Sequence, residues 1–198
     1  FQSPIYSIQE HWDYWRLPKR WDLWPCPHYN VPFVKKGKLV VTVHDLIHLV
    51  FQGKYFNALQ GLYARQSFAW VRAHADAVIA VSHHTKKDLV ERTGIPAEKI
   101  TVIHEGVSEA FRPAENPALV GALRKKYGLA EKFLLYVGNL KPHKNVGQLV
   151  RVFRALRKLN KIQETLVLVG RPDQGLIARD NDLAAAATDP DIRFLAHV

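Results

Sequence analysis

The sequence contains no methionine and only one cysteine, Cys26, among its 198 residues. One cysteine cannot form a disulfide within the chain, so we expect a reducing compartment, the cytoplasm. No uninterrupted apolar run approaches the roughly 18–20 residues that a helix needs to span a bilayer. The first residues, FQSPIYSIQE, lack the charged and apolar regions of a signal peptide. An intact gene product would start with methionine, so we expect this chain to be an internal piece of a longer protein.

Acidic residues are also scarce, because 28 Lys and Arg stand against 18 Asp and Glu, for a formal net charge of +10. Such a charge favours acidic partners: nucleotide phosphates, anionic lipid head groups or nucleic acid. The basic residues are dispersed over several predicted helices, and the sequence has no RRM, KH or zinc-finger signature. A non-catalytic nucleic-acid-binding module is therefore the weaker alternative. Peripheral docking on anionic lipid at the inner membrane face would explain the charge equally well.

Short β-rich apolar runs alternate with helical patterns along the chain. Predicted strands occupy 39–43, 77–81, 100–103, 133–137, 165–169 and 192–195, and predicted helices lie at about 55–74, 83–93, 117–127, 146–160 and 175–187. Most of the apolar runs lack polar alternation, as expected of parallel strands that are covered on both faces. The alternation predicts an α/β fold with parallel sheets flanked by helices.

A polar stretch with two prolines, FRPAENP at 111–117, interrupts both periodicities and predicts a linker. We place the boundary at residue 112, which gives two α/β units, 1–112 and 113–198. Each is smaller than the ~100–150 residues of a typical independent domain. We therefore expect both units to be incomplete.

The N-terminal segment is rich in aromatic residues. Such side chains can stack on a sugar or a base, but more often they bury large apolar area. Packing is therefore the expected role of these residues, which are Trp12, Tyr14, Trp15, Trp21, Trp24 and Tyr29.

The segment YVGNLKPHKN, at 136–145, carries the clearest chemical signal. An apolar strand ends at Gly138, a short turn follows, and Lys144 and Asn145 open an amphipathic helix. A glycine lets a ligand approach the backbone, and free N–H groups at a helix start carry partial positive charge. Lys144 adds a full charge at the same end. These features predict a site for a phosphate-bearing ligand.

Two polar residues are expected to cap helices. Asn145 precedes the helix predicted over 146–160, and Gln148 follows at the position of a capping-box partner. Ser82 follows a predicted strand and is expected to cap the next helix.

Four segments, in order and at plausible spacing, resemble glycosyltransferase family 4, the retaining nucleotide-sugar enzymes of GT-B fold. They are VTVHDL at 41–46, ADAVIAVS at 75–82, IHEGV at 103–107 and GNLKPHKN at 138–145. These segments are similar to the family's "TVHD" strand end, "ADAVIAVS" passage, "vipNGVD" turn and "GtlePRKN" loop. The sequence departs from that pattern at Glu105, where asparagine is commoner, and at His143, where arginine is usual.

The resemblance implies transfer of a hexosyl group from a nucleoside-diphosphate sugar to an acceptor hydroxyl, with retention of configuration and without a metal or other cofactor. The implied acceptor is a saccharide or a lipid-linked saccharide. Residues 1–112 would be the later part of the N-terminal, acceptor-side Rossmann-like domain, and 113–198 the first part of the C-terminal, donor-binding one. The family's glycine-rich loop would precede Phe1 and its Glu-x7-Glu motif would follow Val198. We therefore expect this chain alone to be inactive.

By resemblance, His44 is the catalytic candidate, since it would face the donor sugar and stabilise the transition state through hydrogen bonding. The alternative is an internal structural hydrogen bond at the end of a strand. Asp45 is expected to orient His44 or to cap a turn, rather than to act as a nucleophile.

The resemblance also implies a contact of Lys144 to the donor diphosphate. The full set of implied donor-binding residues is Gly138, Asn139, His143, Lys144 and Asn145. A neutral imidazole at His143 cannot supply the paired donors of an arginine. Weaker candidates to line the cleft are Glu105, Gly106 and Arg171. A structural turn, in which Gly106 supplies an unusual backbone angle, explains the first two equally well, and a surface arginine is the simpler account of Arg171.

A zinc hydrolase is the competing enzyme class, because His44 and His48 have i,i+4 spacing. That motif requires both histidines on one helix and a glutamate as base. Here His44 closes a predicted strand and the neighbouring acid is Asp45. The sequence therefore disfavours a metal hydrolase.

Overall fold

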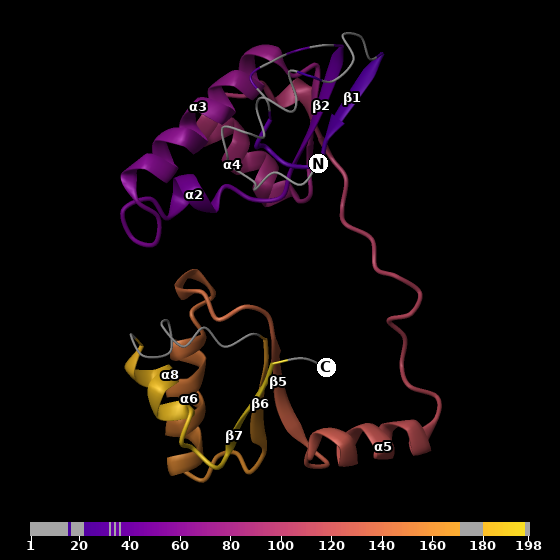
Figure 1. Cartoon of the computed structure of the whole chain (residues 1–198), viewed down its shortest axis with the longest axis vertical. Helices are drawn as coiled ribbons and strands as arrows, with labels where there is room; N and C mark the ends of the chain where they lie inside the picture. Colours follow the sequence, from indigo (N-terminus) through magenta and orange to yellow (C-terminus); the bar gives the residue numbers. More distant parts are fainter. Residues whose placement is uncertain are drawn as a thin grey trace. The chain divides into compact units, whose positions relative to one another are not determined.

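The computed structural model describes residues 16, 22–31, 33, 35, 37–170 and 180–196. The chain divides into two compact units, Phe1–Ser108 and Glu109–Val198, and each is treated by itself (Figure 1). Within the described residues, no helix combines the length and the apolar character needed to cross a membrane.

The first unit contains a sheet of four parallel strands in the order β1-β2-β3-β4. The strands are β1 (Leu23–Cys26), β2 (Lys38–Val43), β3 (Ala77–Ala80) and β4 (Ile100–Val102). The helices between them are α2 (Ile47–Val50), α3 (Ala58–His74), α4 (His83–Thr93) and the 3-10 turn η1 (Ala97–Lys99). The predicted strands of this unit are confirmed to within one residue at each end, whereas β1, α2 and η1 were not predicted.

The core of the first unit lies on one face of this sheet. Side chains on β2 alternate, with Leu39, Val41 and Val43 buried and Val40 and Thr42 only partly buried. Successive right-handed crossovers that advance in one direction place their helices on the same face of a sheet. The expectation of strands covered on both faces is therefore wrong for the described part of this unit.

The two described N-terminal aromatics that were predicted to pack both do so. Tyr29 is buried, and its ring stacks on that of Phe68 with the centroids 4.5 Å apart. Trp24 is partly buried and packs against the same core. Trp12, Tyr14, Trp15 and Trp21 lie outside the described residues.

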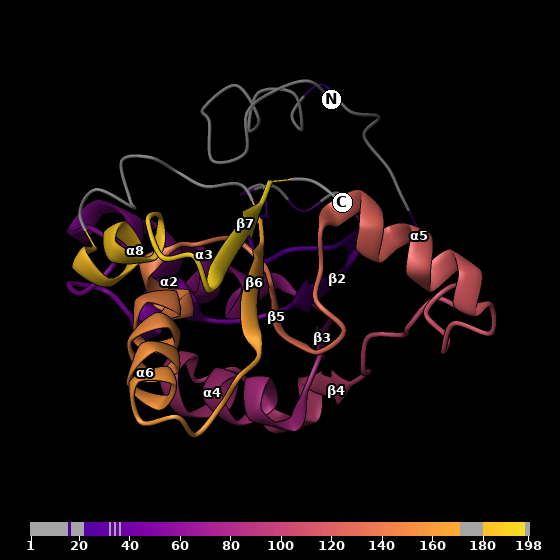
Figure 2. The same cartoon turned by 90° about the horizontal axis from the view of Figure 1, so that it is seen from below.

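The second unit contains three parallel strands in the order β5-β6-β7. They are β5 (Phe133–Val137), β6 (Thr165–Val169) and β7 (Ile192–Leu195), and their predicted bounds are confirmed. The helical segments are α5 (Pro117–Tyr127), the 3-10 turn η2 (Pro142–Lys144), α6 (Val146–Lys158) and α8 (Asn181–Ala186). Both α6 and α8 lie on one face of this sheet (Figure 2). That face holds the core of the unit, which includes Val150, Phe153, Leu166, Leu168 and Leu183.

The other face of this sheet is exposed along β5, whereas Val167 of β6 is buried there. Leu135 and Val137 of β5 are 57% and 69% exposed. With Leu123 and Tyr127 of α5, they line a groove of about 300 Å³ whose walls are almost wholly apolar. The apolar runs of this unit were expected to be covered on both faces. Among the described residues, β6 confirms that expectation, since 166–169 are all buried, whereas β5 contradicts it.

Three arginines of α6 form ion pairs with aspartates that belong to α8 or follow it. The closest nitrogen–oxygen distances are 2.6 Å for Arg151–Asp182, 3.1 Å for Arg154–Asp189 and 2.7 Å for Arg157–Asp191. Exposed pairs of this kind contribute roughly 0–1 kcal/mol each. Their main consequence is that part of the basic charge is neutralised within the unit, which weakens the case for a nucleic-acid-binding surface on α6.

One predicted helix cap is confirmed and the other is wrong. The Ser82 hydroxyl accepts a hydrogen bond from the Thr85 backbone N–H at 3.0 Å and so caps α4. Asn145 makes no side-chain cap, because it adopts a left-handed conformation (φ 55°, ψ 36°) between η2 and α6. The capping box with Gln148 is therefore not formed.

The predicted bounds of three helices need correction. The helix expected over 55–74 begins at Ala58, where Asn57 and Gln60 form a capping box. The helix expected over 146–160 ends at Lys158. Of the helix expected over 175–187, the structure describes Asn181–Ala186, whereas 175–179 lie outside the described residues.

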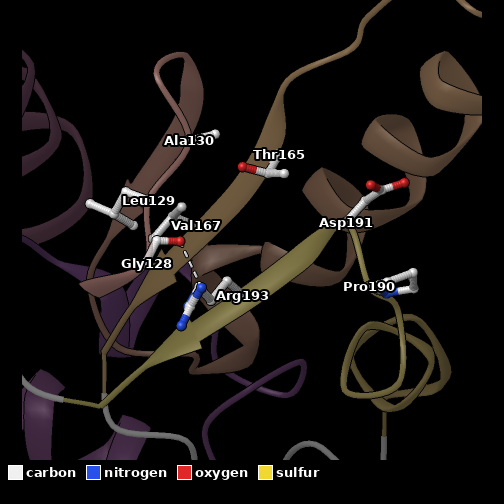
Figure 3. A pocket seen from close by; sticks show the side chains of 8 residues that line it. All are labelled: Gly128, Leu129, Ala130, Thr165, Val167, Pro190, Asp191 and Arg193. Atoms are coloured by element: carbon white, nitrogen blue, oxygen red, sulfur yellow. Dashed lines mark hydrogen bonds between the residues drawn. The ribbon is translucent and has the colours of Figure 1, made fainter. Parts of the chain in front are cut away.

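Helix α5 is tied to the sheet through its C-terminus. Gly128 ends the helix in a left-handed conformation (φ 59°), and its carbonyl accepts a hydrogen bond from Arg193 of β7 at 2.7 Å (Figure 3). This contact borders a hollow of about 110 Å³, which Thr165 and Asp191 also line. The hollow lies where β6 and β7 begin. Ligands of open parallel sheets bind outside the carboxyl ends of the strands, so this hollow is not the predicted phosphate site.

Cys26 is buried, and burial raises the pKa of its thiol from 9.0 to about 11. We expect its alkylation by iodoacetamide at about pH 8 to be roughly 100-fold slower in the folded chain than in the denatured chain, because the thiolate is the reactive form. The raised pKa also makes the free energy of unfolding depend on pH, because the folded state favours the neutral thiol. The contribution of Cys26 to stability is fully present below pH 9.0 and is lost as the pH rises through about 11. Equal alkylation rates with and without denaturant would contradict the assignment.

Candidate functional site

In the second unit, a glycine follows each of two neighbouring strands, β5 and β6, at the carboxyl edge of the sheet. Gly138 follows β5 and donates its N–H to the Val169 carbonyl at 2.9 Å, and Gly170 follows β6 and donates to the Leu195 carbonyl at 2.9 Å. A Cβ on Gly170 would lie 2.0 Å from the Gly138 carbonyl oxygen. The two backbones therefore meet at a distance that only glycine allows at position 170.

The loop after Gly138 is held by its own hydrogen bonds. The Tyr136 hydroxyl donates to the Asn139 carbonyl at 2.8 Å, and the Asn139 side-chain oxygen accepts from the Lys141 N–H at 3.3 Å. The N–H of Lys144 then donates to the Lys141 carbonyl at 2.9 Å, within η2. Asn139 thus shapes the loop, and buried Leu140 anchors it to the core.

Lys144 lies at the end of η2 with its side chain exposed. No hydrogen bond or ion pair joins its ammonium group to another described residue. His143, beside it, is half-buried, and Asn145 is exposed. The five predicted donor-binding residues thus lie together in one loop at the carboxyl edge of β5, where an ammonium group is available for an anion.

The amino end of α6 already faces a carboxylate. A Cβ on Gly147 would lie 2.4 Å from Asp180 Oδ2, and Asp180 Oδ1 also caps α8 by accepting from the N–H groups of Asp182 and Leu183 at 3.0 and 3.2 Å. Positive charge for an anion at this loop would therefore come from the Lys144 side chain rather than from the first turn of α6.

In the first unit, the strand ends bring together His44 and Glu105. His44 follows β2 and Glu105 follows β4, and the His44 Nδ1 to Glu105 Oε1 distance is 2.8 Å. His44 Nε2 donates to the Pro27 carbonyl at 3.0 Å. Asp45 does not orient His44. Its Oδ1 accepts from the Ile47 N–H at 3.1 Å, which is the alternative role predicted for it, that of capping a turn.

The weaker predicted residues have different outcomes. Gly106 is exposed, and its φ does not fall in the positive region, so the expectation that it supplies an unusual backbone angle is wrong. Arg171 lies outside the described residues.

Two further histidines gather at this carboxyl edge and were not predicted as site residues. His83 starts α4 after β3, and His104 follows β4, with their ring centroids 5.7 Å apart. The Nδ1 of His104 lies 3.2 Å from the Val81 carbonyl oxygen, to which it donates. The signal that could have found both is their position directly after parallel strands, since all such strand ends meet at one edge.

The geometry contradicts the zinc-hydrolase alternative. His44 follows a strand, whereas His48 lies on α2 and its Nδ1 is 2.7 Å from the Tyr29 hydroxyl oxygen. Across the part of the chain that the structure describes, no three His, Cys, Asp or Glu residues are grouped so that they could hold a metal ion.

The chain is similar in sequence to known glycosyltransferases. Residues 4–111 match the sequence pattern of Glycosyltransferase Family 4. The Escherichia coli mannosyltransferase WbdA is 29% identical over 133 residues, which is 66% of this chain and 16% of WbdA. The glycogen synthase of Mycobacterium tuberculosis is 29% identical over 149 residues, covering 74% of this chain and 31% of the synthase.

Solved structures share the fold. The Anabaena protein HepE, in complex with UDP and glucose, superposes with a TM-score of 0.69 at 20% identity, covering 90% of this chain and 48% of HepE. A Rickettsia africae glycosyltransferase superposes with a TM-score of 0.57 at 21% identity, covering 89% of this chain and 47% of its own.

This chain therefore spans about half the length of these structural relatives, and less of the curated ones. The α/β fold with Rossmann-like units, as in GT-B enzymes, is confirmed. Relatives of this kind favour a transferase over a non-catalytic nucleic-acid-binding module. Because the matched pattern extends over more than half of its residues, the chain belongs to glycosyltransferase family 4.

Proposed function

We propose that the protein containing this chain transfers a hexosyl group from a nucleoside-diphosphate sugar to an acceptor hydroxyl, with retention of the anomeric configuration. The observation that carries the proposal is the exposed Lys144, placed after a strand-ending glycine in a family 4 chain. A diphosphate leaving group gains negative charge in the transition state, so a fixed cation beside it lowers the barrier.

Relatives support this substrate class. WbdA is named a mannosyltransferase, and HepE was solved with UDP-glucose and with UDP and glucose. The acceptor is proposed to be a saccharide or a lipid-linked saccharide, used at the cytoplasmic side of a membrane. The net charge of +10 supports peripheral contact with anionic head groups there.

Each unit has its proposed role. The second unit, the first part of the donor-binding domain, would hold the diphosphate at Gly138 and Lys144, with Asn139, His143 and Asn145 shaping the loop. The first unit, the later part of the acceptor-side domain, would contribute His44. A hydrogen-bond donor at His44 would hold the sugar as it becomes oxocarbenium-like, because interactions that strengthen in the transition state raise the rate.

Calorimetric titration of this chain with UDP, GDP and ADP, each with and without EDTA, tests the proposal. We expect the chain to bind one of the three more tightly than the others, with the affinity unchanged by EDTA. No heat of binding from any nucleotide, by a chain shown to be folded by circular dichroism, would contradict the proposal. Binding that disappears in EDTA would contradict the metal-free mechanism.

A further inference from the structure

Both ring nitrogens of His44 face hydrogen-bond acceptors. Nε2 lies 3.0 Å from the Pro27 carbonyl oxygen, and Nδ1 lies 2.8 Å from Glu105 Oε1. A carbonyl oxygen only accepts, and so does an ionised carboxylate. The two hydrogen bonds can therefore exist together only when both ring nitrogens carry a proton.

Three strand ends position this ring. Pro27 follows β1, His44 follows β2 and Glu105 follows β4, in one parallel sheet. The side chains of His44 and Glu105 remain 45% and 66% exposed, so a ligand can reach the ring. The two hydrogen bonds are unequal, because a bond to a charged carboxylate is roughly twice as strong as one to a neutral carbonyl. A ligand oxygen would more easily replace the Pro27 carbonyl than the Glu105 carboxylate.

We propose that Glu105 is the positioning residue of His44: its carboxylate holds Nδ1–H and so fixes the ring with Nε2 directed toward an oxygen of the donor sugar. The importance of this pair for catalysis rests on the proposed function. Glu105 thus takes the orienting role that the sequence suggested for Asp45.

Ring nitrogen chemical shifts of the chain labelled with ¹⁵N-histidine test the proposal, because they report protonation at each nitrogen. We expect Nδ1 of His44 to carry a proton in the unchanged chain, because an ionised Glu105 carboxylate can only accept a hydrogen bond. In Glu105→Gln, whose amide N–H can donate to Nδ1 while Nε2–H still donates to the Pro27 carbonyl, we expect Nε2 to carry the proton and Nδ1 to lose it. In Glu105→Ala we expect the preference for a proton on Nδ1 to be lost.

Two controls distinguish loss of the Glu105–His44 hydrogen bond from damage to the fold. Glu98→Ala removes an exposed carboxylate from η1, in the same unit, and should leave both His44 signals unchanged. The ring of His48, bonded to Tyr29, should keep its shifts in every variant that folds.

An unprotonated Nδ1 on His44 in the unchanged chain would overturn the proposal. Identical His44 shifts in Glu105→Gln, Glu105→Ala and the unchanged chain would overturn it as well. Because no nucleotide is added, this result is independent of the nucleotide titration. A chain that binds no nucleotide but shows the expected His44 shifts would contradict the proposed function and leave the role of Glu105 in place.

Discussion

Replacing Lys144 with alanine is expected to weaken binding of the preferred nucleoside diphosphate by between about 10- and 100-fold. The ammonium group is exposed at the carboxyl edge of β5, and its neighbours form the loop through which a diphosphate would approach. A hydrogen bond to a charged group contributes about 1.5–3 kcal/mol, and every 1.4 kcal/mol is about tenfold in affinity. Stability should change by less than about 0.5 kcal/mol, because the side chain is at the surface.

Lys141→Ala is the matched control for this substitution. Lys141 is exposed in the same loop, carries the same charge and lies just before η2. We expect its removal to reduce nucleotide affinity only slightly, because Lys141 would contribute only to the overall positive electrostatic potential around the loop. If calorimetry gave equal losses for the two variants, the binding would reflect the net basic charge of the region, and the specific role of Lys144 would be wrong.

Gly170→Ala is expected to destabilise the second unit by about 3 kcal/mol or more, the upper range for an overpacked backbone contact. The added Cβ would lie 2.0 Å from the Gly138 carbonyl oxygen. That oxygen cannot move away easily, because the Gly138 N–H is bonded to Val169 and the Gly170 N–H to Leu195. Urea denaturation followed by circular dichroism measures the loss as a lower midpoint.

Gly121→Ala in the same unit is the matched control and is expected to increase stability. Gly121 lies inside α5, and a Cβ there would meet nothing within 4 Å. Alanine in a helix interior is favoured over glycine by roughly 0.5–1 kcal/mol, so the midpoint should rise. If the Gly170→Ala variant were as stable as Gly121→Ala, the ends of β5 and β6 would be able to separate. The contact between Gly138 and Gly170 would then not require glycine at position 170.

The strands that could be predicted from sequence are those with uninterrupted apolar runs, such as β5 and β6. The edge strand β1 was missed because Pro25 lies within it, and proline normally argues against a strand. An edge position tolerates it, since one side of the strand needs no backbone donor. Which strands are edges depends on the sheet order, and sequence periodicity does not contain that order.

The cap of α6 failed for a local reason. Asn145 is a favoured cap residue, but it is also one of the few residues that tolerate a left-handed backbone. The 3-10 turn η2 brings the chain into α6 through such a conformation, with φ 55° at Asn145. Asparagine suits both a helix cap and a left-handed backbone conformation, so the residue type alone could not show which role Asn145 has.

The grouping of the candidate donor-binding residues in one loop was predictable because they are nearly consecutive in sequence, whereas the surroundings of His44 were not. Its partner Glu105 is 61 residues away in sequence, and the two meet only because β2 and β4 end at one edge. From sequence, the adjacent Asp45 was the natural candidate to orient the ring. Its carboxylate is instead used by the Ile47 N–H.

A nucleoside diphosphate is expected to bind this chain at the loop after β5. Mapping the backbone amide shifts of the ¹⁵N-labelled chain during titration with UDP and GDP tests that location directly. We predict that the largest shifts with the bound nucleotide fall on Gly138–Asn145 and on Gly170, and that uridine or guanosine without phosphate shifts these amides far less. Saturable shifts confined to other residues, or equal shifts from nucleoside and nucleotide, would contradict the claim.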